Sequence, residues 1–255
     1  ALVCVDYYGF NRRVLPLAQA AGIPAFYFVS PQVWASRPGR VQVLKRLVRK
    51  MLVIFPFEEK LYREAGVPVE FVGHPLLDLI PEPAQRARDL SAPVVGLLPG
   101  SRSSEIERHL PLFYEAFRLL REKRLGMKGL LFASANQPDS AYGALPDGVE
   151  IVREQDYRRR ATLDLALCSS GTATLENALL GVPMVVVYRL SWPTYLIARA
   201  LVNVKHIAMA NLLAGHAVVP ELIQGDASSE RAAAEAARFL DDDSLYTRTR
   251  EELLT

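Results

Sequence analysis

The sequence contains little cysteine, no long apolar run and almost no net charge, and each shortage excludes a class of protein. Its two cysteines, Cys4 and Cys168, lie in apolar runs, so we predict small buried side chains rather than a zinc site or a disulfide framework. No apolar run approaches the roughly 20 residues of a membrane-spanning helix. The net charge of +2 is far from that of a strongly basic domain, so we predict no nucleic-acid partner. Because no signal-peptide pattern is present, we expect a cytoplasmic protein whose membrane contact is peripheral.

Apolar residues make up 50% of the chain and occur in short continuous runs separated by helical patterns. Continuous runs are typical of parallel strands covered on both faces, so we predict an α/β fold. The predicted strands are Leu2–Val5, Ala25–Val29, Met51–Phe55, Val69–Val72, Val94–Leu98, Gly129–Ala133, Val149–Val152, Leu163–Cys168 and Met184–Tyr188. The predicted helices are Asn11–Ala21, Gly39–Arg49, Phe57–Ala65, Ser104–Arg121, Thr172–Leu180, Pro193–Leu201 and Ser229–Leu240.

The polar, proline-containing segment Ile80–Asp89 interrupts this alternation and is typical of a linker. We therefore predict two Rossmann-like domains in series, the first in residues 1–80 and the second in 94–255, joined by a linker at 81–93. The chain starts at Ala1 inside a predicted strand, so we expect the first domain to be incomplete. Ligands of parallel sheets bind beyond the carboxyl ends of strands, and the loops at those ends are the candidate sites.

The first candidate loop follows the predicted strand Val94–Leu98. Gly100 allows the backbone to turn and approach a ligand, Ser101 adds a hydroxyl, and Arg102 carries a permanent charge suited to phosphate. The predicted helix that follows offers free N–H groups at its start. The same residues are also compatible with an ordinary strand–helix turn that has a capping serine and a surface arginine.

The second candidate loop follows the predicted strand Leu163–Cys168 and contains Ser170, Gly171 and Thr172. Glu176 lies about one turn into the next predicted helix, where its carboxylate can accept hydrogen bonds from two ribose hydroxyls. It can also be an ordinary favourable charge near a helix start. Together the two loops predict a nucleotide diphosphate held between two helix starts.

Asp6 ends the strand Leu2–Val5, where a carboxylate can act as a general base. An aspartate there more often caps a turn or helix, but Asn11 is the better cap candidate in this stretch.

His74 also ends a strand, and is compatible with a cleft position or with a structural hydrogen bond. We interpret His109 as a solvated helix position. His206 and His216 have no metal-ligand spacing, so we predict no metal site and no cofactor.

The stretch Arg37–Lys50 carries six basic and no acidic residues. Val41, Leu44, Leu47 and Val48 fall on one helical face. The stretch can be a surface helix that happens to be basic. Alternatively, Arg37 and Arg40 contact a sugar phosphate or anionic lipid headgroups, where each basic residue contributes about 1 kcal/mol.

Several blocks, in order and at similar spacing, resemble one family, the lipid-A-disaccharide synthases. The most distinctive are Ser30-Pro31-Gln32-Val33-Trp34-Ala35 and Leu98-Pro99-Gly100-Ser101-Arg102, the second together with Glu105. The likeness covers nearly the whole chain, and eight blocks in register do not recur by chance. The other six are Val5–Asn11, Arg37–Arg40, Phe55–Glu58, Phe71–Pro75, Ser170–Glu176 and Asn211–Gly215.

The resemblance implies a glycosyltransferase of GT-B type, with two Rossmann-like domains facing a cleft. The acceptor side is in residues 1–80 and the UDP-sugar side in 94–255. It implies inverting transfer of 2,3-diacylglucosamine from UDP-2,3-diacylglucosamine to lipid X (2,3-diacylglucosamine 1-phosphate), with release of UDP and formation of a β-1,6 linkage. It makes Asp6 the general base, Arg102 a phosphate-binding residue, and Ser170–Thr172, Glu176 and Asn211 further residues of the active site. It also implies peripheral contact with an anionic inner-membrane surface, and homodimers.

The chain departs from the family pattern at Tyr8, Ser36 and His216, where the family usually has Pro, Trp and Arg. Tyr8 affects the turn that aims Asp6. The family's N-terminal Gly-Glu-x-Ser-Gly-Asp loop and its last helix are not in this sequence, so we expect an incomplete acceptor half. Two alternatives stay open: a non-catalytic UDP-binding remnant, and another UDP-sugar enzyme of the same fold.

Overall fold

The computed structural model describes residues 1–35, 38–83, 88–154, 156–191, 195 and 206–255. The described residues form two compact units: the first contains those up to Asp78 together with Tyr195, and the second contains those from Leu79 to Ser191 and from His206 to Thr255. The predicted helix Pro193–Leu201 falls, except for Tyr195, outside the described residues, and so does Arg37. None of the described helices is long and apolar enough to cross a membrane.

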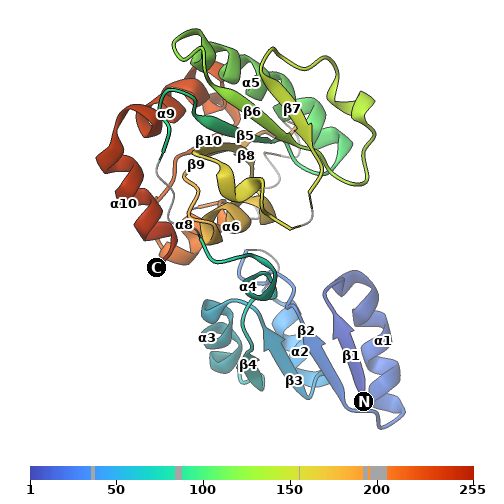
Figure 1. Cartoon of the computed structure of the whole chain (residues 1–255). Coiled ribbons are helices and arrows are strands. Elements are labelled where there is room, and N and C mark those ends of the chain that lie inside the picture. Colours follow the sequence, from blue (N-terminus) through green and yellow to red (C-terminus); the bar gives the residue numbers. More distant parts are fainter. Residues whose placement is uncertain (36–37, 84–87, 155, 192–194, 196–205) are drawn as a thin grey trace. The chain divides into compact units, whose positions relative to one another are not determined.

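The first unit is a parallel sheet with the strand order β1-β2-β3-β4 (Figure 1). Its strands are β1 (Leu2–Val5), β2 (Ala25–Phe28), β3 (Lys50–Val53) and β4 (Val69–Phe71). Its helices are α1 (Tyr8–Ala20), α2 (Arg40–Leu47) and α3 (Pro56–Glu64), and α4 (Leu76–Leu79) crosses the boundary to the second unit.

Helices and strands of the first unit share one apolar core. Leu15 of α1, Tyr27 of β2, Leu44 of α2 and Met51 of β3 are fully buried in it. Val41 and Val48 are buried and Leu47 packs against the same core, which confirms the predicted apolar face of the basic stretch. Burying each such side chain contributes about 1.5–3 kcal/mol.

The second unit is a parallel sheet with the strand order β10-β9-β8-β5-β6-β7 (Figure 1). From β5 the chain builds one side of the sheet, and with β8 it returns to build the other side. The loops after β5 and β8 therefore flank the point where the strand order reverses, the usual ligand position in such sheets. The strands are β5 (Val94–Leu98), β6 (Lys128–Phe132), β7 (Val149–Val152), β8 (Leu165–Ser169), β9 (Met184–Tyr188) and β10 (Glu221–Ile223).

Separate apolar clusters on the two sides of this sheet bury its strands, which explains their continuous apolar runs. Helices α5 (Ser103–Glu122) and α9 (Ser229–Asp241) contribute to one cluster, and α6 (Thr172–Leu179) and α8 (Met209–Ala214) to the other. Helix α10 (Asp243–Leu253) follows α9, and three short 3-10 helices are η1 (Asp139–Tyr142), η2 (Arg160–Thr162) and η3 (Gln224–Asp226).

The predicted α/β class with two parallel sheets is confirmed, and four predicted strands have the observed bounds. Both cysteines are free and buried, as predicted. The sequence patterns missed α4, α8, β10 and α10. The first three have only 4, 6 and 3 residues, too few for an apolar period to show. Helix α10 is mostly polar, and its start is set by Asp242, whose side chain accepts a hydrogen bond from the Leu245 N–H.

The linker assignment to residues 81–93 stays a prediction, but its last part is anchored in the second unit. The Arg88 guanidinium pairs with Asp243 at 2.7 Å, lies 3.8 Å from the ring centroid of Tyr246, and donates to the Phe239 carbonyl. Because only 10% of the Arg88 side chain is exposed, these contacts fix Arg88 against α9 and α10.

Candidate functional site

A cavity of about 370 Å³ opens at the carboxyl ends of β5, β6, β7 and β8. Seven residues singled out in the sequence line it together: Gly100, Ser101, Arg102, Ser170, Gly171, Thr172 and Glu176. The lining also includes residues that sequence reasoning missed, notably Phe132, Ser134, Glu154 and Arg160. Such a volume lies within the range of small-molecule sites.

The β5–α5 loop is held by Glu105. Its carboxylate accepts the backbone N–H groups of Ser101 at 3.0 Å and Arg102 at 3.2 Å, and pairs with the Arg102 guanidinium at 2.7 Å. Burial acts to raise the pKa of Glu105, but these hydrogen bonds and the guanidinium outweigh it and hold the pKa below its usual value. Gly100 has φ +112°, and a Cβ there would lie 2.6 Å from a Glu105 oxygen, so the close packing needs glycine.

The start of α6 differs from that of α5, because no side chain caps it. Gly171 is the N-cap residue, with φ +151° and no side-chain hydrogen bond, and the first turn has no acidic residue. The Ser170 hydroxyl is directed elsewhere and donates to the Ile207 carbonyl at 3.0 Å. The partial positive charge of the helix start is therefore available at the cavity wall.

Glu176 is engaged by two neighbours. Its carboxylate forms an ion pair with Arg160 and accepts the Tyr157 hydroxyl at 3.0 Å. The exposed fractions of the Arg160 and Glu176 side chains are only 13% and 16%. Arg160 stands in the run Arg158-Arg159-Arg160, and nothing in the spacing separates it from its exposed neighbours. Its position between β7 and β8 is the one feature of the sequence that could have indicated a place in the site.

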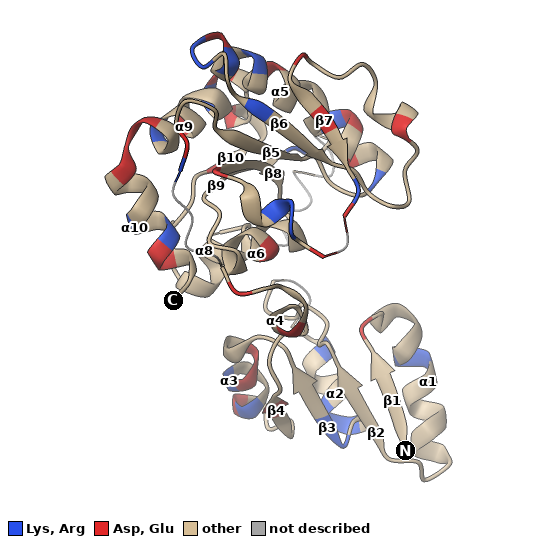
Figure 2. Cartoon of the chain, viewed as in Figure 1, with Lys and Arg blue, Asp and Glu red and all other residues tan. Residues whose placement is uncertain are grey.

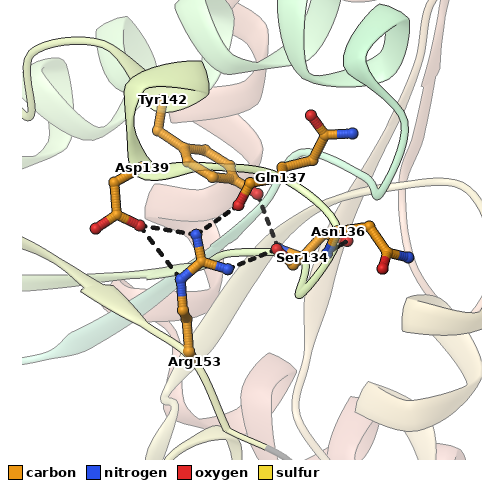
Figure 3. Close-up of polar contacts among 6 residues, drawn as sticks. All are labelled: Ser134, Asn136, Gln137, Asp139, Tyr142 and Arg153. Atoms are coloured by element: carbon orange, nitrogen blue, oxygen red, sulfur yellow. Dashed lines mark hydrogen bonds and ion pairs between the residues drawn. The ribbon is translucent and has the colours of Figure 1, made fainter.

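Arg153 organises the loop after β6 (Figure 3). Its guanidinium donates to the carbonyls of Ser134 and Gln137, both at 2.6 Å, and to the Asp139 carboxylate at 2.7 Å. The Gln137 side chain then contacts the Ser101 carbonyl and the Ser103 hydroxyl. The loops after β5 and β6 are thus joined at the rim of the cavity.

The interpretation of His109 as a solvated position is wrong. The ring is 1% exposed, its Nδ1 lies 3.0 Å from the Pro99 carbonyl, and its Nε2 accepts the Arg189 N–H at 3.2 Å. An accepting Nε2 requires the proton on Nδ1, so the ring is neutral and Nδ1 donates to Pro99. Burial lowers the pKa of His109. The residue joins the end of β5 to the end of β9.

Asn211 lies outside the cavity and is fully buried. Its amide nitrogen donates to the Val219 carbonyl and to Glu221, both at 2.8 Å, while its oxygen accepts the N–H groups of Val218 and Val219. Every hydrogen-bonding position of the amide is filled, and the side chain braces α8 against β10.

Asp6 lies in the first unit, at the carboxyl end of β1, and is exposed. Asp6 and Tyr7 have φ values of +42° and +34°, a left-handed conformation that strains residues with a Cβ. The choice of Asn11 as helix cap is wrong, because it lies inside α1 and Tyr7 is the cap residue. Asn11 instead donates to the Asp6 carbonyl at 2.6 Å, and the Tyr27 hydroxyl donates there too. These contacts hold the turn and leave the carboxylate unused by described residues.

His74 and Arg40 also lie in the first unit. His74 accepts the Leu76 N–H at 3.1 Å and lies 5.3 Å from the Phe55 ring, and burial lowers its pKa. Arg40 lies over the Tyr8 ring at 4.6 Å. Arg40, Arg12, Tyr8 and Gly9 line a second cavity of about 420 Å³. Within the described residues, no group of three His, Cys, Asp or Glu side chains could hold a metal ion.

A family model described as lipid-A-disaccharide synthetase matches residues 1–253. The chain belongs to this family. The lipid-A-disaccharide synthase of Geobacter metallireducens is 44% identical over 263 residues, covering 99% of this chain and 68% of that protein. The enzyme of Syntrophus aciditrophicus is 45% identical, covering 99% of this chain and 69% of that protein. The family makes this chain a hexosyltransferase-like enzyme, a glycosyltransferase of lipid A synthesis.

Solved structures support the same fold at low identity. S. aureus MnaA aligns with a TM-score of 0.65 at 11% identity, covering 98% of this chain and 69% of that one. The calicheamicin glycosyltransferase CalG4 aligns with a TM-score of 0.60 at 17% identity, covering 98% and 67%. These likenesses show the GT-B type of α/β fold and no more.

Proposed function

We propose that the chain transfers 2,3-diacylglucosamine from UDP-2,3-diacylglucosamine to lipid X with inversion. The 6-hydroxyl oxygen of the acceptor attacks the anomeric carbon opposite UDP and loses its proton to Asp6. The bond from the anomeric carbon to the UDP oxygen breaks, and UDP leaves. The observation that carries the proposal is the cavity of about 370 Å³ in which Arg102, the uncapped start of α6 and Glu176 meet.

The donor side follows from the chemistry of that cavity. The diphosphate lies at the start of α6, where free N–H groups and the helix dipole favour an anion. Arg102, with 79% of its side chain exposed, supplies a charge for the leaving UDP. Glu176 accepts from the ribose hydroxyls. Two structures of the same fold were solved with such ligands, MnaA with UDP and Anabaena HepE with UDP-glucose.

The acceptor side rests on the first unit. The exposed carboxylate of Asp6 stands on a turn whose backbone is fixed by Asn11 and Tyr27, as a general base requires. Arg12 and Arg40 line one cavity together with Tyr8 and Gly9, which directly follow the Asp6–Tyr7 turn in the sequence, and they suit the acceptor 1-phosphate. The exposed basic face of α2 suits an anionic inner-membrane surface. We also propose that the enzyme forms homodimers, as the family resemblance implies.

The test is transfer of diacylglucosamine from UDP-2,3-diacylglucosamine to radiolabelled lipid X, with the G. metallireducens enzyme as a positive control. Disaccharide with a β-linkage supports the proposal. Binding of UDP without any disaccharide would instead support the non-catalytic alternative.

Asp6→Asn separates the base from the donor site. Because the substitution removes the proton acceptor and keeps the side-chain shape, we expect UDP affinity within twofold and turnover reduced by at least about 100-fold. Asp78→Asn, an acid-to-amide change elsewhere in the first unit, is the control and should retain turnover. Loss of donor binding in Asp6→Asn would contradict the role of general base.

A further inference from the structure

Arg160 lies in the wall of the cavity, with 13% of its side chain exposed, but has no place in the reaction described above. We propose that Arg160 is a positioning residue that fixes the Glu176 carboxylate and so makes the cavity selective for a nucleotide with both ribose hydroxyls. The inference rests on the proposed binding of UDP in this cavity and adds the element that sets its sugar selectivity.

The backbone of Arg160 is itself held in place. The Glu154 carboxylate, another part of the cavity lining, accepts the N–H groups of Arg159 at 2.6 Å and Arg160 at 2.8 Å. Tyr157, just before, has φ +60°, a conformation that costs energy for a residue with a Cβ and persists only where its surroundings enforce it. The segment between β7 and β8 is therefore built to present one guanidinium.

That guanidinium is confined by rings as well as by charge. Its carbon lies 5.0 Å from the ring centroid of Phe132 and 5.5 Å from that of Tyr157, within the range of cation–π attraction. Its Nε–H is buried without an acceptor among the described residues, which is a cost to folding. The contacts with the two rings and with Glu176 therefore hold the Arg160 charge in one position beside the Glu176 carboxylate.

Arg160 and Tyr157 leave acceptor capacity on the carboxylate. Arg160 engages one Glu176 oxygen and the Tyr157 hydroxyl engages the other. Each carboxylate oxygen accepts about two hydrogen bonds, so one position on each oxygen remains. Two neighbouring ribose hydroxyls supply two donors of matching spacing. A carboxylate free to rotate would present this pair of acceptors only part of the time.

Replacing Arg160 by an uncharged residue also removes a positive charge near the diphosphate. The experiment must separate this electrostatic effect from the loss of Glu176 positioning. The diphosphate is common to UDP and 2′-deoxy-UDP, so loss of the Arg160 charge weakens both nucleotides equally. Loss of Glu176 positioning weakens only the nucleotide that has the 2′-hydroxyl. The ratio of the two dissociation constants therefore reports positioning alone.

The experiment is calorimetric titration of the full chain with UDP and with 2′-deoxy-UDP. We expect wild type to prefer UDP by roughly tenfold, the effect of one hydrogen bond to a charged group. Arg160→Met should reduce this preference to about twofold or less, and Arg160→Lys, which keeps a charge without the planar fork, should give an intermediate ratio. Tyr157→Phe removes one hydroxyl and should lower the ratio in the same direction. Arg118→Met is the matched control, because Arg118 pairs with Glu115 and Glu122 on the exposed side of α5.

The outcomes distinguish the inference from the proposed function. An unchanged ratio in folded Arg160→Met and in Tyr157→Phe overturns the inference and leaves UDP binding intact. No preference in wild type overturns it as well. If wild type binds neither nucleotide, the proposed donor site fails and the inference fails with it. Should Arg160→Met not fold, the ratios of Arg160→Lys and Tyr157→Phe decide.

Discussion

Single charged residues around the cavity are paired with one another. Arg102 with Glu105, and Arg153 with Asp139, are partly exposed pairs, and such pairs contribute at most about 1 kcal/mol to stability. Arg160 with Glu176 is far less exposed, and the cost of desolvating both ions offsets much of their attraction. These ion pairs therefore act mainly by holding the loops in position, and they contribute little to the stability of the fold.

Arg102→Ala should weaken UDP binding by about tenfold or more, because the diphosphate loses a charge-assisted hydrogen bond. Stability should change by less than about 1 kcal/mol, since the pair with Glu105 is exposed. Calorimetry and thermal melting measure the two effects. Arg108→Ala, an exposed arginine of α5 outside the cavity lining, is the control. Equal UDP affinity in Arg102→Ala and wild type would remove Arg102 from the donor site.

His109 should make stability depend on pH. Its pKa is lowered in the folded protein, so below the ordinary value of 6.5 the unfolded chain takes up a proton that the folded chain does not. The contribution of the neutral ring is complete above that pH and is lost as pH falls toward the folded pKa. The surrounding charges are Glu105, Arg108 and Arg189.

Denaturant titrations at pH 8.0 and 5.5 measure this effect. His109→Gln keeps a donor and an acceptor but cannot titrate, so its loss of stability on acidification should be smaller than that of wild type. His74, whose pKa is also lowered, is common to both proteins and cancels in the comparison. An identical loss in both proteins would show that His109 does not titrate in this range.

At the scale of elements, helices α5 and α6 follow similar strands and loops but differ at their first turns. Helix α5 carries its own acid, and Glu105 occupies the N–H groups of Ser101 and Arg102. Helix α6 has no acidic residue in its first turn and no cap. An incoming phosphate therefore finds free N–H groups at α6 and a guanidinium at α5, rather than the two equivalent helix starts that the sequence predicts.

Helix α2 is the element we expect to contact anionic lipid. Its apolar side is buried, whereas Lys45, Arg46 and the nearby Arg49 are exposed. Figure 2 shows basic segments in blue on α2. Replacing all three by glutamine should weaken binding to anionic vesicles by roughly 3 kcal/mol at low salt, about 1 kcal/mol per charge. Vesicle co-sedimentation measures the change.

The control replaces three exposed basic residues of the second unit, Lys123, Arg158 and Arg231, by glutamine. It lowers the net charge equally. Equal loss of vesicle binding in both triple variants would mean that net charge, and not α2, attracts the lipid.

At the scale of the whole molecule, the chain has two compact units with separate apolar cores. Every residue of the proposed donor cavity belongs to the second unit, and Asp6 belongs to the first. The proposed function therefore assigns donor binding and proton transfer to different units of one chain.

UDP should stabilise one unit more than the other. A ligand at 100 times its dissociation constant stabilises the folded form that binds it by about 2.7 kcal/mol. Hydrogen exchange with and without UDP should show this protection in core amides of β8 and α6, while those of β2 and β3 change little. Equal protection in both sheets would mean that the units unfold together.

The sequence by itself determined the α/β class, most strand positions, the loops that form the cavity and the family. Continuous apolar runs, glycines at strand ends and contiguous motifs are local features, and they are read directly from neighbouring residues. Tertiary structure alone decided the contacts of Arg160, His109 and Asn211. Each of these depends on a partner brought close by the fold: a carboxylate on another helix, a strand end 80 residues away along the chain, or a buried turn. Whether a charge is paired, a histidine is buried or a helix start is free depends on packing in three dimensions, and no spacing within the chain encodes it.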